Sequence, residues 1–144
     1  MDVRLETTYG ATKKFVAAGL EGFNRQHLTS SPPKSFAVTL RKNDAAYGGL
    51  VAEGIGDWMV ISLLWVEESF RGRGFGTSLL AAAETEAKKR GAAGILVDTY
   101  SFQAPAFYRK NGYSSYGQVE NFPESGMSWV RFKKVFDRLA PQQR

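Results

Sequence analysis

Three glycines at alternate positions, Gly72, Gly74 and Gly76, are the feature that most limits how this chain folds. They follow an apolar run at residues 60–66 and precede a segment with helical periodicity, so they predict a tight loop from a strand into a helix. Glycine permits a sharp turn and lets a bulky group approach the main chain. The first turn of the helix presents free backbone N–H groups at the positive end of its dipole. The sequence therefore predicts a site for an anion such as phosphate.

Two arginines strengthen the prediction of an anion site at this loop. Arg71 and Arg73 can each donate paired hydrogen bonds to phosphate oxygens. The spacing excludes the common nucleotide loops, because the chain has no GxxxxGK[ST] motif and its glycines follow GxGxG instead of GxGxxG. A plain glycine-rich turn with solvated arginines is the alternative interpretation.

The segment Arg71-Gly-Arg-Gly-Phe-Gly76 resembles the coenzyme A loop of the GNAT superfamily of N-acetyltransferases, whose signature is Arg/Gln-x-x-Gly-x-Gly/Ala. Val66 lies five positions before the arginine, as in the strand that precedes this loop in the family. A later segment resembles a second family signature, Asn-x-x-Ala-x-x-x-Tyr followed by Gly-Phe or Gly-Tyr. Four residues match it, namely Ala104, Tyr108, Gly112 and Tyr113, and Ser101 stands at the position of the Asn.

The resemblance implies an α/β protein with a single mixed, largely antiparallel central sheet and flanking helices. It implies acetyl-coenzyme A as the co-substrate. It also implies that the end of the strand at 58–66, at residues 64–66, diverges from the next parallel strand, so that its backbone groups pair with the pantetheine arm. The implied cofactor-binding residues are Leu64, Trp65, Val66, Arg71, Gly72, Arg73, Gly74, Phe75, Gly76, Thr77 and Ser101, with Gln103 as a replacement for the family's Asn.

The resemblance also implies a reaction, the transfer of an acetyl group from the thioester to a primary amine through a tetrahedral intermediate. Tyr108 is the candidate general acid, because the family places this phenol near the coenzyme sulfur and a phenol of reference pKa about 10 is protonated at neutral pH. A packing role for this tyrosine is the alternative. A backbone N–H near Val66 is the oxyanion candidate. Among the nearby acids Glu67, Glu68 and Asp98, we consider Glu67 and Glu68 as bases, with a water-relayed deprotonation as the alternative.

Composition sets further limits on the chain. Its 144 residues suit one domain, which we expect at residues 1–138, followed by a short flexible tail at 139–144. The absence of Cys and the single His argue against a cysteine nucleophile and a multi-histidine zinc site, so no metal is expected. No apolar run resembles a signal core or a membrane span, which predicts a cytoplasmic protein without a membrane partner. The net charge of +5 favours an anionic partner, and coenzyme A is an anion.

Hydrophobic periodicity predicts the secondary structure. The predicted elements are a strand at 2–7, a helix at 12–27, strands at 36–40, 47–55 and 58–66, a helix at 74–90, a strand at 94–100, a short helix at 106–110, and strands at 113–119 and 127–135. The strand at 58–66 is almost entirely apolar, which favours a central position with both faces buried. It should be parallel to the strand at 94–100, because a helix connects the two.

Two other classes of protein remain open. A non-catalytic coenzyme A-binding module would keep the loop but lack a working acid at Tyr108. A basic RNA-binding domain would need exposed stacking residues on a sheet face, and a single RG-rich stretch gives no reason to expect a nucleic-acid partner. The expected acceptor is a small-molecule amine, with a protein amine as the alternative, in a pocket near Phe23, Pro32 and Phe122. The oligomeric state is open, and the resemblance allows a homodimer.

Overall fold

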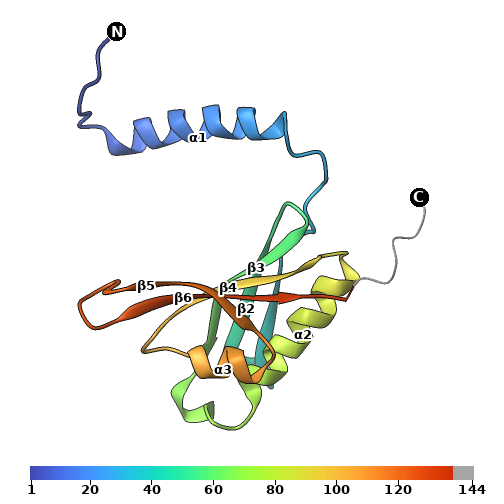
Figure 1. Ribbon diagram of the computed structural model, residues 1–144. Helices are drawn as coiled ribbons and strands as arrows, with labels where there is room; N and C mark the ends of the chain where they lie inside the picture. The colour runs from blue at the N-terminus through green and yellow to red at the C-terminus, as the bar shows by residue number, and fades with distance from the viewer. Residues whose placement is uncertain (138–144) are drawn as a thin grey trace. The chain divides into compact units, whose positions relative to one another are not determined.

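The computed structural model describes residues 1–137. These residues form two compact units, one at residues 1–31 and one that begins at Pro32. The first unit contains α1 (Tyr9–Arg25). The second contains, in chain order, β1 (Phe36–Lys42), β2 (Ala45–Ile55), β3 (Trp58–Val66), the 3₁₀ helix η1 (Glu68–Phe70), α2 (Phe75–Lys89), β4 (Gly94–Tyr100), α3 (Pro105–Lys110), β5 (Ser114–Glu120) and β6 (Ser128–Val135) (Figure 1). The predicted tail at 139–144 lies outside the described residues, and a single domain over 1–138 stays a prediction.

The N-terminal unit has one helix and no strand. The helix predicted at 12–27 is present as α1, which starts three residues earlier than predicted. The strand predicted at 2–7 is wrong, since these residues have no regular structure and Val3 and Leu5 are fully exposed. Alternating apolar residues favour a strand only when a neighbouring strand accepts and donates the backbone hydrogen bonds, and residues 1–31 contain no other strand. None of the helices within residues 1–137 is long and apolar enough to cross a membrane.

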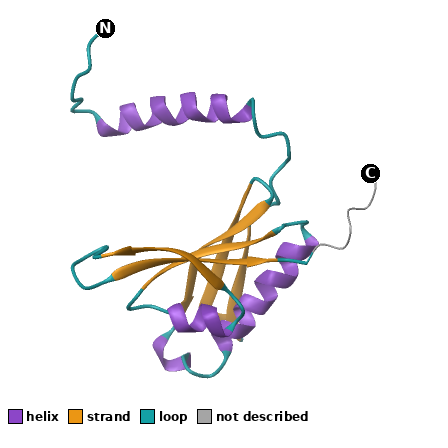
Figure 2. Ribbon diagram, in the orientation of Figure 1, coloured by secondary structure: helices purple, strands orange, loops and turns teal. Residues whose placement is uncertain are grey.

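The second unit is built on one six-stranded sheet in the order β1-β2-β3-β4-β6-β5. Four of the neighbouring pairs are antiparallel, and only β3 and β4 are parallel. The predicted α/β fold with a mixed, largely antiparallel sheet and flanking helices is therefore confirmed. From β1 onward every predicted element is present with its ends within two residues of the prediction. The parallel pair places the carboxyl ends of β3 and β4 at the same edge of the sheet, where α2 and α3 begin (Figure 2).

The hydrophobic core lies between one face of the sheet and the helices α2 and α3. Ala83 and Ala87 of α2 are fully buried, because a methyl side chain lets the helix backbone approach the strands closely. On the sheet side the largest fully buried residues are Phe132, Leu50, Met59 and Ile95. Tyr108 of α3 and Tyr113 complete the core at the carboxyl end of the parallel strands.

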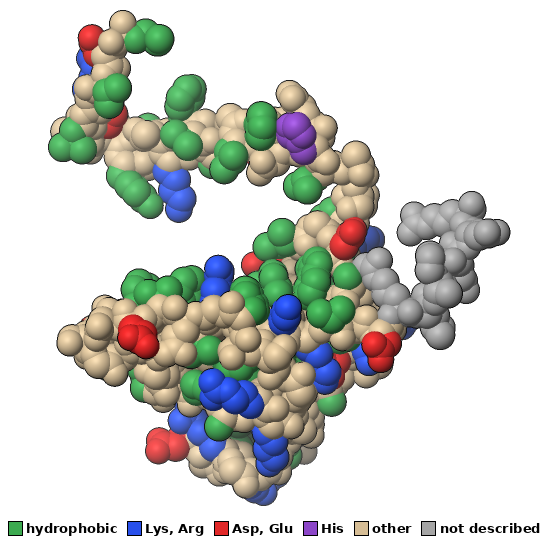
Figure 3. All heavy atoms as spheres, in the orientation of Figure 1, with side chains coloured by type: hydrophobic (Ala, Val, Ile, Leu, Met, Phe, Trp, Pro, Cys, Tyr) green, Lys and Arg blue, Asp and Glu red, His purple; other side chains and the backbone are tan. Residues whose placement is uncertain are grey.

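The opposite face of the sheet carries exposed apolar residues, in disagreement with the expectation that β3 is buried on both faces. Leu63 and Trp65 of β3 are 67% and 57% exposed. In the unit that begins at Pro32, the helices pack against one face only, so the outward-facing half of an apolar strand stays uncovered. Hydrophobic side chains gather along the side of the sheet that faces away from α2 and α3 (Figure 3).

Candidate active site

The site is organised around a split between β3 and β4. The two strands pair only where Met59–Ile61 lie beside Ile95–Val97, whereas β3 continues to pair with β2 as far as Val66. The N–H of Glu67 donates to the carbonyl of Tyr47 on the β2 side at 2.8 Å. Successive residues of a strand direct their backbone groups to opposite sides, so Val66 presents its N–H and carbonyl to the split. The predicted divergence of the end of β3 is confirmed, and it leaves backbone groups without a strand partner.

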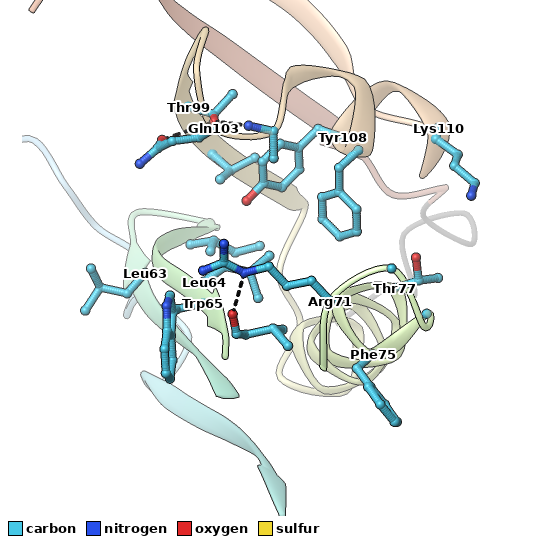
Figure 4. Close-up of a pocket in the computed structure, with 18 of the residues that line it drawn as sticks. Leu63, Leu64, Trp65, Arg71, Phe75, Thr77, Thr99, Gln103, Tyr108 and Lys110 are labelled. Carbon is cyan, nitrogen blue, oxygen red and sulfur yellow. Dashed lines mark hydrogen bonds between the residues drawn. The ribbon is translucent and has the colours of Figure 1, made fainter. Parts of the chain in front are cut away.

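A cavity of about 720 Å³ opens at this split. It is bounded by the ends of β3 and β4, the loop before α2, and α3 (Figure 4). The predicted cofactor-binding residues that line it are Leu64, Trp65, Val66, Arg71, Gly72, Gly74, Phe75, Gly76, Thr77 and Gln103. Arg73 and Ser101 are not part of its lining.

The glycine loop has the backbone conformation that its sequence predicts. Gly72 and Gly74 adopt positive φ angles of 72° and 84°, which side-chain-bearing residues rarely adopt. Gly74 is the N-cap of α2, and no atom lies within 4 Å of the position where a Cβ would be. The following residues Phe75, Gly76 and Thr77 form the first turn of the helix and line the cavity. Their backbone N–H groups, together with the helix dipole, provide the geometry of an anion site.

The two arginines of the loop lie in different surroundings. Arg71 lines the cavity, and its Nε donates a hydrogen bond of 2.8 Å to the carbonyl of Val66. The guanidinium of Arg73 lies over the rings of Phe70 and Phe75, at 5.5 and 5.4 Å from their centroids. A second cation in the lining comes instead from Lys110 at the end of α3, which the sequence analysis missed. Its sequence signal was weak, because it stands between Tyr108 and Gly112 at a position where the second signature specifies no residue type.

Gln103 and Ser101 also differ in their contacts. The hydroxyl of Ser101 accepts a hydrogen bond of 3.0 Å from the N–H of Ser128, so it joins β6 to the end of β4. The side-chain oxygen of Gln103 accepts from Thr99 Oγ1 and from the N–H of Tyr100, at 3.2 and 3.0 Å. These two bonds fix the Gln103 amide at the cavity wall (Figure 4). Its NH₂ group makes none of the hydrogen bonds found among residues 1–137 and is left as a donor.

Tyr108 combines deep burial with access to the cavity. Its ring is only 5% exposed and packs against Phe107, Tyr113 and Phe132, with centroids 5.1 to 5.7 Å apart. Its hydroxyl points into the cavity and forms no hydrogen bond within the described part of the chain (Figure 4). Burial raises the pKa of Tyr108 to about 12, because the phenolate would lose its hydration. The phenol is therefore a proton-bearing donor throughout the neutral range.

The predicted bases lie away from the cavity lining. Glu67 is the N-cap of η1, and its carboxylate accepts a hydrogen bond of 3.0 Å from Ser69 Oγ. Glu68 is the first residue of η1, and neither glutamate lines the cavity. The third acid considered, Asp98 on β4, does line it. Among residues 1–137 no group of three potential metal-binding side chains is present.

A sheet that opens at parallel strand ends, with a glycine loop and a helix N-terminus beside the opening, defines an α/β protein with the geometry of an anion site at the edge of its strands. Comparison with known proteins specifies the class further. Residues 6–113 match the family model described as Acetyltransferase (GNAT) family, and the chain belongs to this family. It is an acetyltransferase by descent, and the predicted family assignment is confirmed.

Two relatives and one solved structure illustrate the similarity. An acetyltransferase from Agrobacterium fabrum is 33% identical over 125 residues, which cover 86% of this chain and 90% of the relative. Blasticidin-S acetyltransferase from Streptomyces morookaense is 37% identical over 89 residues, covering 61% of this chain and 65% of that protein. The crystal structure of an acetyltransferase from Bacillus cereus is 31% identical, with a TM-score of 0.84 and coverage of 93% of this chain and 98% of the other.

Proposed function

We propose that this protein transfers the acetyl group of acetyl-coenzyme A to a primary amine of a small molecule. The observation that carries the proposal is the split between β3 and β4, because its unpaired backbone groups, the anion loop and the Tyr108 hydroxyl all border one cavity. An extended cofactor with a pyrophosphate at one end and a thioester at the other matches these groups, with the pyrophosphate at the anion loop and the thioester near Tyr108.

The residues divide the binding of coenzyme A between them. The amides of Phe75, Gly76 and Thr77 ligate the pyrophosphate, and Arg71 and Lys110 supply the opposite charge. The backbone of β3 at Leu64 pairs with an amide of the pantetheine arm in place of a strand. The free NH₂ group of Gln103 donates to a pantetheine carbonyl on the other wall of the cavity.

The chemistry follows from the groups at the thioester end of the cavity. The amine nitrogen attacks the thioester carbon, and the N–H of Val66 stabilises the oxyanion of the tetrahedral intermediate. The C–S bond then breaks as the amide forms, and the Tyr108 hydroxyl donates to the departing sulfur. A pKa of about 12 exceeds the reference pKa of a thiol, about 8.5, so Tyr108 donates a hydrogen bond more readily than it gives up its proton. Glu67 and Glu68 lie outside the lining, which favours proton removal from the amine through water.

The relatives support a small-molecule acceptor. One relative is named for the acetylation of blasticidin S, which is a small molecule and not a protein N-terminus. A protein acceptor would need a surface to dock on, whereas the cavity is sized for a cofactor and a small partner.

The test is thermal unfolding with and without coenzyme A, combined with an assay for thiol release from acetyl-coenzyme A in the presence of amines. Coenzyme A at about 100 times its dissociation constant should stabilise the fold by about 2.7 kcal/mol and raise the melting temperature. Absence of any shift at millimolar coenzyme A would overturn the cofactor assignment. Stabilisation without thiol release for any amine would identify a non-catalytic coenzyme A-binding module instead.

A further inference from the structure

The cavity does not end at the cofactor side of the sheet. Ile61, Val97 and Thr99, which line it, are buried on the face that carries α2, whereas Leu63 and Asp98, which also line it, lie on the opposite face. Since neighbouring residues of one strand line the same cavity from both faces, the cavity passes through the sheet at the split. Its far end is formed by Leu63, Trp65, Phe102 and Asp98.

Asp98 is a carboxylate held in place at this far end. It lies opposite Arg131 in the register of β4 and β6, and its Oδ1 accepts a hydrogen bond of 3.3 Å from Arg131 Nε. The guanidinium of Arg131 in turn lies 4.8 Å from the ring centroid of Trp129. The hydrogen bond to Asp98 raises the pKa of Arg131. Within residues 1–137 the Oδ2 atom of Asp98 has no hydrogen-bond donor, so an acceptor for a cationic N–H group remains at the cavity mouth.

Beside Asp98 lies an aromatic cluster that the hydrophobic core does not use. It consists, in order of contact, of Phe102, Tyr100, Phe122 and Trp129, and the ring centroids of neighbours in this order are 5.5 to 6.1 Å apart. Tyr100 and Phe102 are stacked with an interplanar angle of 18°. Phe102 is nevertheless 60% exposed, and it faces the cavity. Exposed aromatic faces at a cavity mouth are surfaces on which planar or cationic groups stack favourably.

We propose that this far end of the cavity binds the acceptor as a primary amine attached to a planar ring, with Asp98 pairing with the ammonium group and the aromatic cluster holding the ring. The inference rests on the proposed acetyl transfer. It adds the class of acceptor and assigns Asp98 to its capture. The ammonium group gives up a proton before its nitrogen attacks, so the Asp98 contact is made before the transition state. Loss of this contact should therefore raise KM more than it lowers kcat.

The first experiment compares three primary amines as acceptors at saturating acetyl-coenzyme A, measured by thiol release. 2-Phenylethylamine carries a ring, n-butylamine carries none, and spermidine carries additional charge without a ring. We expect kcat/KM for 2-phenylethylamine to exceed that for n-butylamine by about tenfold or more, the effect of one aromatic contact together with its buried area. The Phe102→Leu variant should reduce this ratio, because only the ring-bearing amine loses an aromatic contact.

The second experiment tests Asp98 with the Asp98→Asn variant, which keeps the size and the acceptor for Arg131 but removes the charge. KM for 2-phenylethylamine should rise about tenfold to 100-fold, as expected for a lost charge-assisted hydrogen bond. The affinity for coenzyme A and the melting temperature should stay close to those of the parent. The matched control is Asp57→Asn at the turn between β2 and β3, at the other end of β3, and its kinetics should equal the parent's.

The outcomes separate this inference from the proposed function. Equal kcat/KM values for the ring-bearing and ringless amines, or a preference for spermidine, overturn the proposed acceptor class while acetyl transfer stands. An unchanged KM in Asp98→Asn overturns the role of Asp98. Failure to acetylate any of the three amines, by a protein that binds coenzyme A, overturns the proposed reaction with these acceptors and the inference with it.

Discussion

At the scale of single residues, the position of Tyr108 explains why a phenol suits the end of this cavity. Three aromatic rings surround it, and its hydroxyl is the part left facing the cavity. Burial both orients the group and keeps it protonated, since its pKa is raised to about 12. In the proposed reaction, a group that holds its proton this firmly acts through the strength of its hydrogen bond to the departing sulfur.

The Tyr108→Phe variant is expected to lower kcat about 100-fold, the low end of the range for loss of one preorganised hydrogen-bond donor to a developing negative charge. The ring packing and the affinity for coenzyme A should remain, because only the hydroxyl is removed. Steady-state kinetics with a good acceptor and a binding measurement together check this expectation. Turnover close to the parent's would mean that solvent, and not Tyr108, serves the departing thiolate.

The arginines of the loop offer a matched pair of variants. Arg71→Ala removes a cation from the cavity lining and should weaken coenzyme A binding by about tenfold to 100-fold, the loss of a charge-assisted hydrogen bond. Arg73→Ala removes a guanidinium that stacks on Phe70 and Phe75 outside the lining, so its effect on affinity should be much smaller. Isothermal titration of both variants with coenzyme A tests the difference. A larger effect for Arg73 than for Arg71 would contradict the placement of the phosphate contacts.

At the scale of elements, the strands and helices from residue 36 onward were predictable because each depends on local signals. Apolar runs, Gly and Pro positions and helical periodicity give the ends of these elements to within two residues. The strand expected at 2–7 failed because a strand depends on a partner that may be far away in the sequence, and alternation carries no information about the partner. Local patterns also do not reveal which distant residues a helix contacts. Glu84 of α2 forms an ion pair with Lys134 of β6 at 3.1 Å and accepts a hydrogen bond of 3.0 Å from the Tyr113 hydroxyl.

The backbone conformation of the candidate site could be predicted from the sequence, whereas the directions of several of its side chains could not. The loop from Gly72 to Gly76 follows from the conformational needs of glycine, and the motif identifies it. The direction of the side chains of Arg73, Ser101 and Lys110 depends on tertiary contacts that no local pattern encodes. The aromatic cluster and the Asp98–Arg131 pair have the same origin, since β6 inserts between β4 and β5.

The split between β3 and β4 leads to a prediction for hydrogen exchange. The amide of Val66 faces the split and should exchange rapidly in the free protein, whereas the amides of Met59–Ile61 in the paired part should be protected. Acetyl-coenzyme A should slow exchange at Val66, because in the proposed site this N–H donates to the thioester oxygen. Exchange followed by NMR in the two states provides the measurement. The N–H of Glu67, which is bonded to Tyr47, serves as the control that should change little.

At the scale of the whole molecule, the buried tyrosines link stability to alkaline pH. In the unfolded chain Tyr108 loses its proton at about pH 10, whereas the folded protein retains the proton up to about pH 12. Between these values the unfolded chain binds fewer protons, so the free energy of unfolding falls as pH rises, by up to about 3 kcal/mol. The pKa of Tyr113 is also raised, by burial and by the neighbouring Glu84, and it acts in the same direction.

Urea denaturation at a series of pH values from about 8 to 11 measures this loss of stability. Below about pH 10 Tyr108 is protonated in both the folded and the unfolded chain, so it should not make the free energy of unfolding depend on pH. In the Tyr108→Phe variant one ionisable phenol is absent, so the fall should be shallower than in the parent. Parallel curves for the two proteins would show that other groups cause the alkaline unfolding.

The incomplete pairing of β3 and β4 also affects how the protein tolerates mutation. A cofactor held by main-chain amides contacts atoms that every amino acid has, so side chains along that edge can vary without loss of the cofactor. In the proposed acceptor site, Phe102 and Asp98 contact the amine substrate through their side chains, so substitutions there should change which amine is acetylated. A single opening in the sheet would thus allow new acceptors to be acquired on one face while the cofactor contacts on the other face stay as they are.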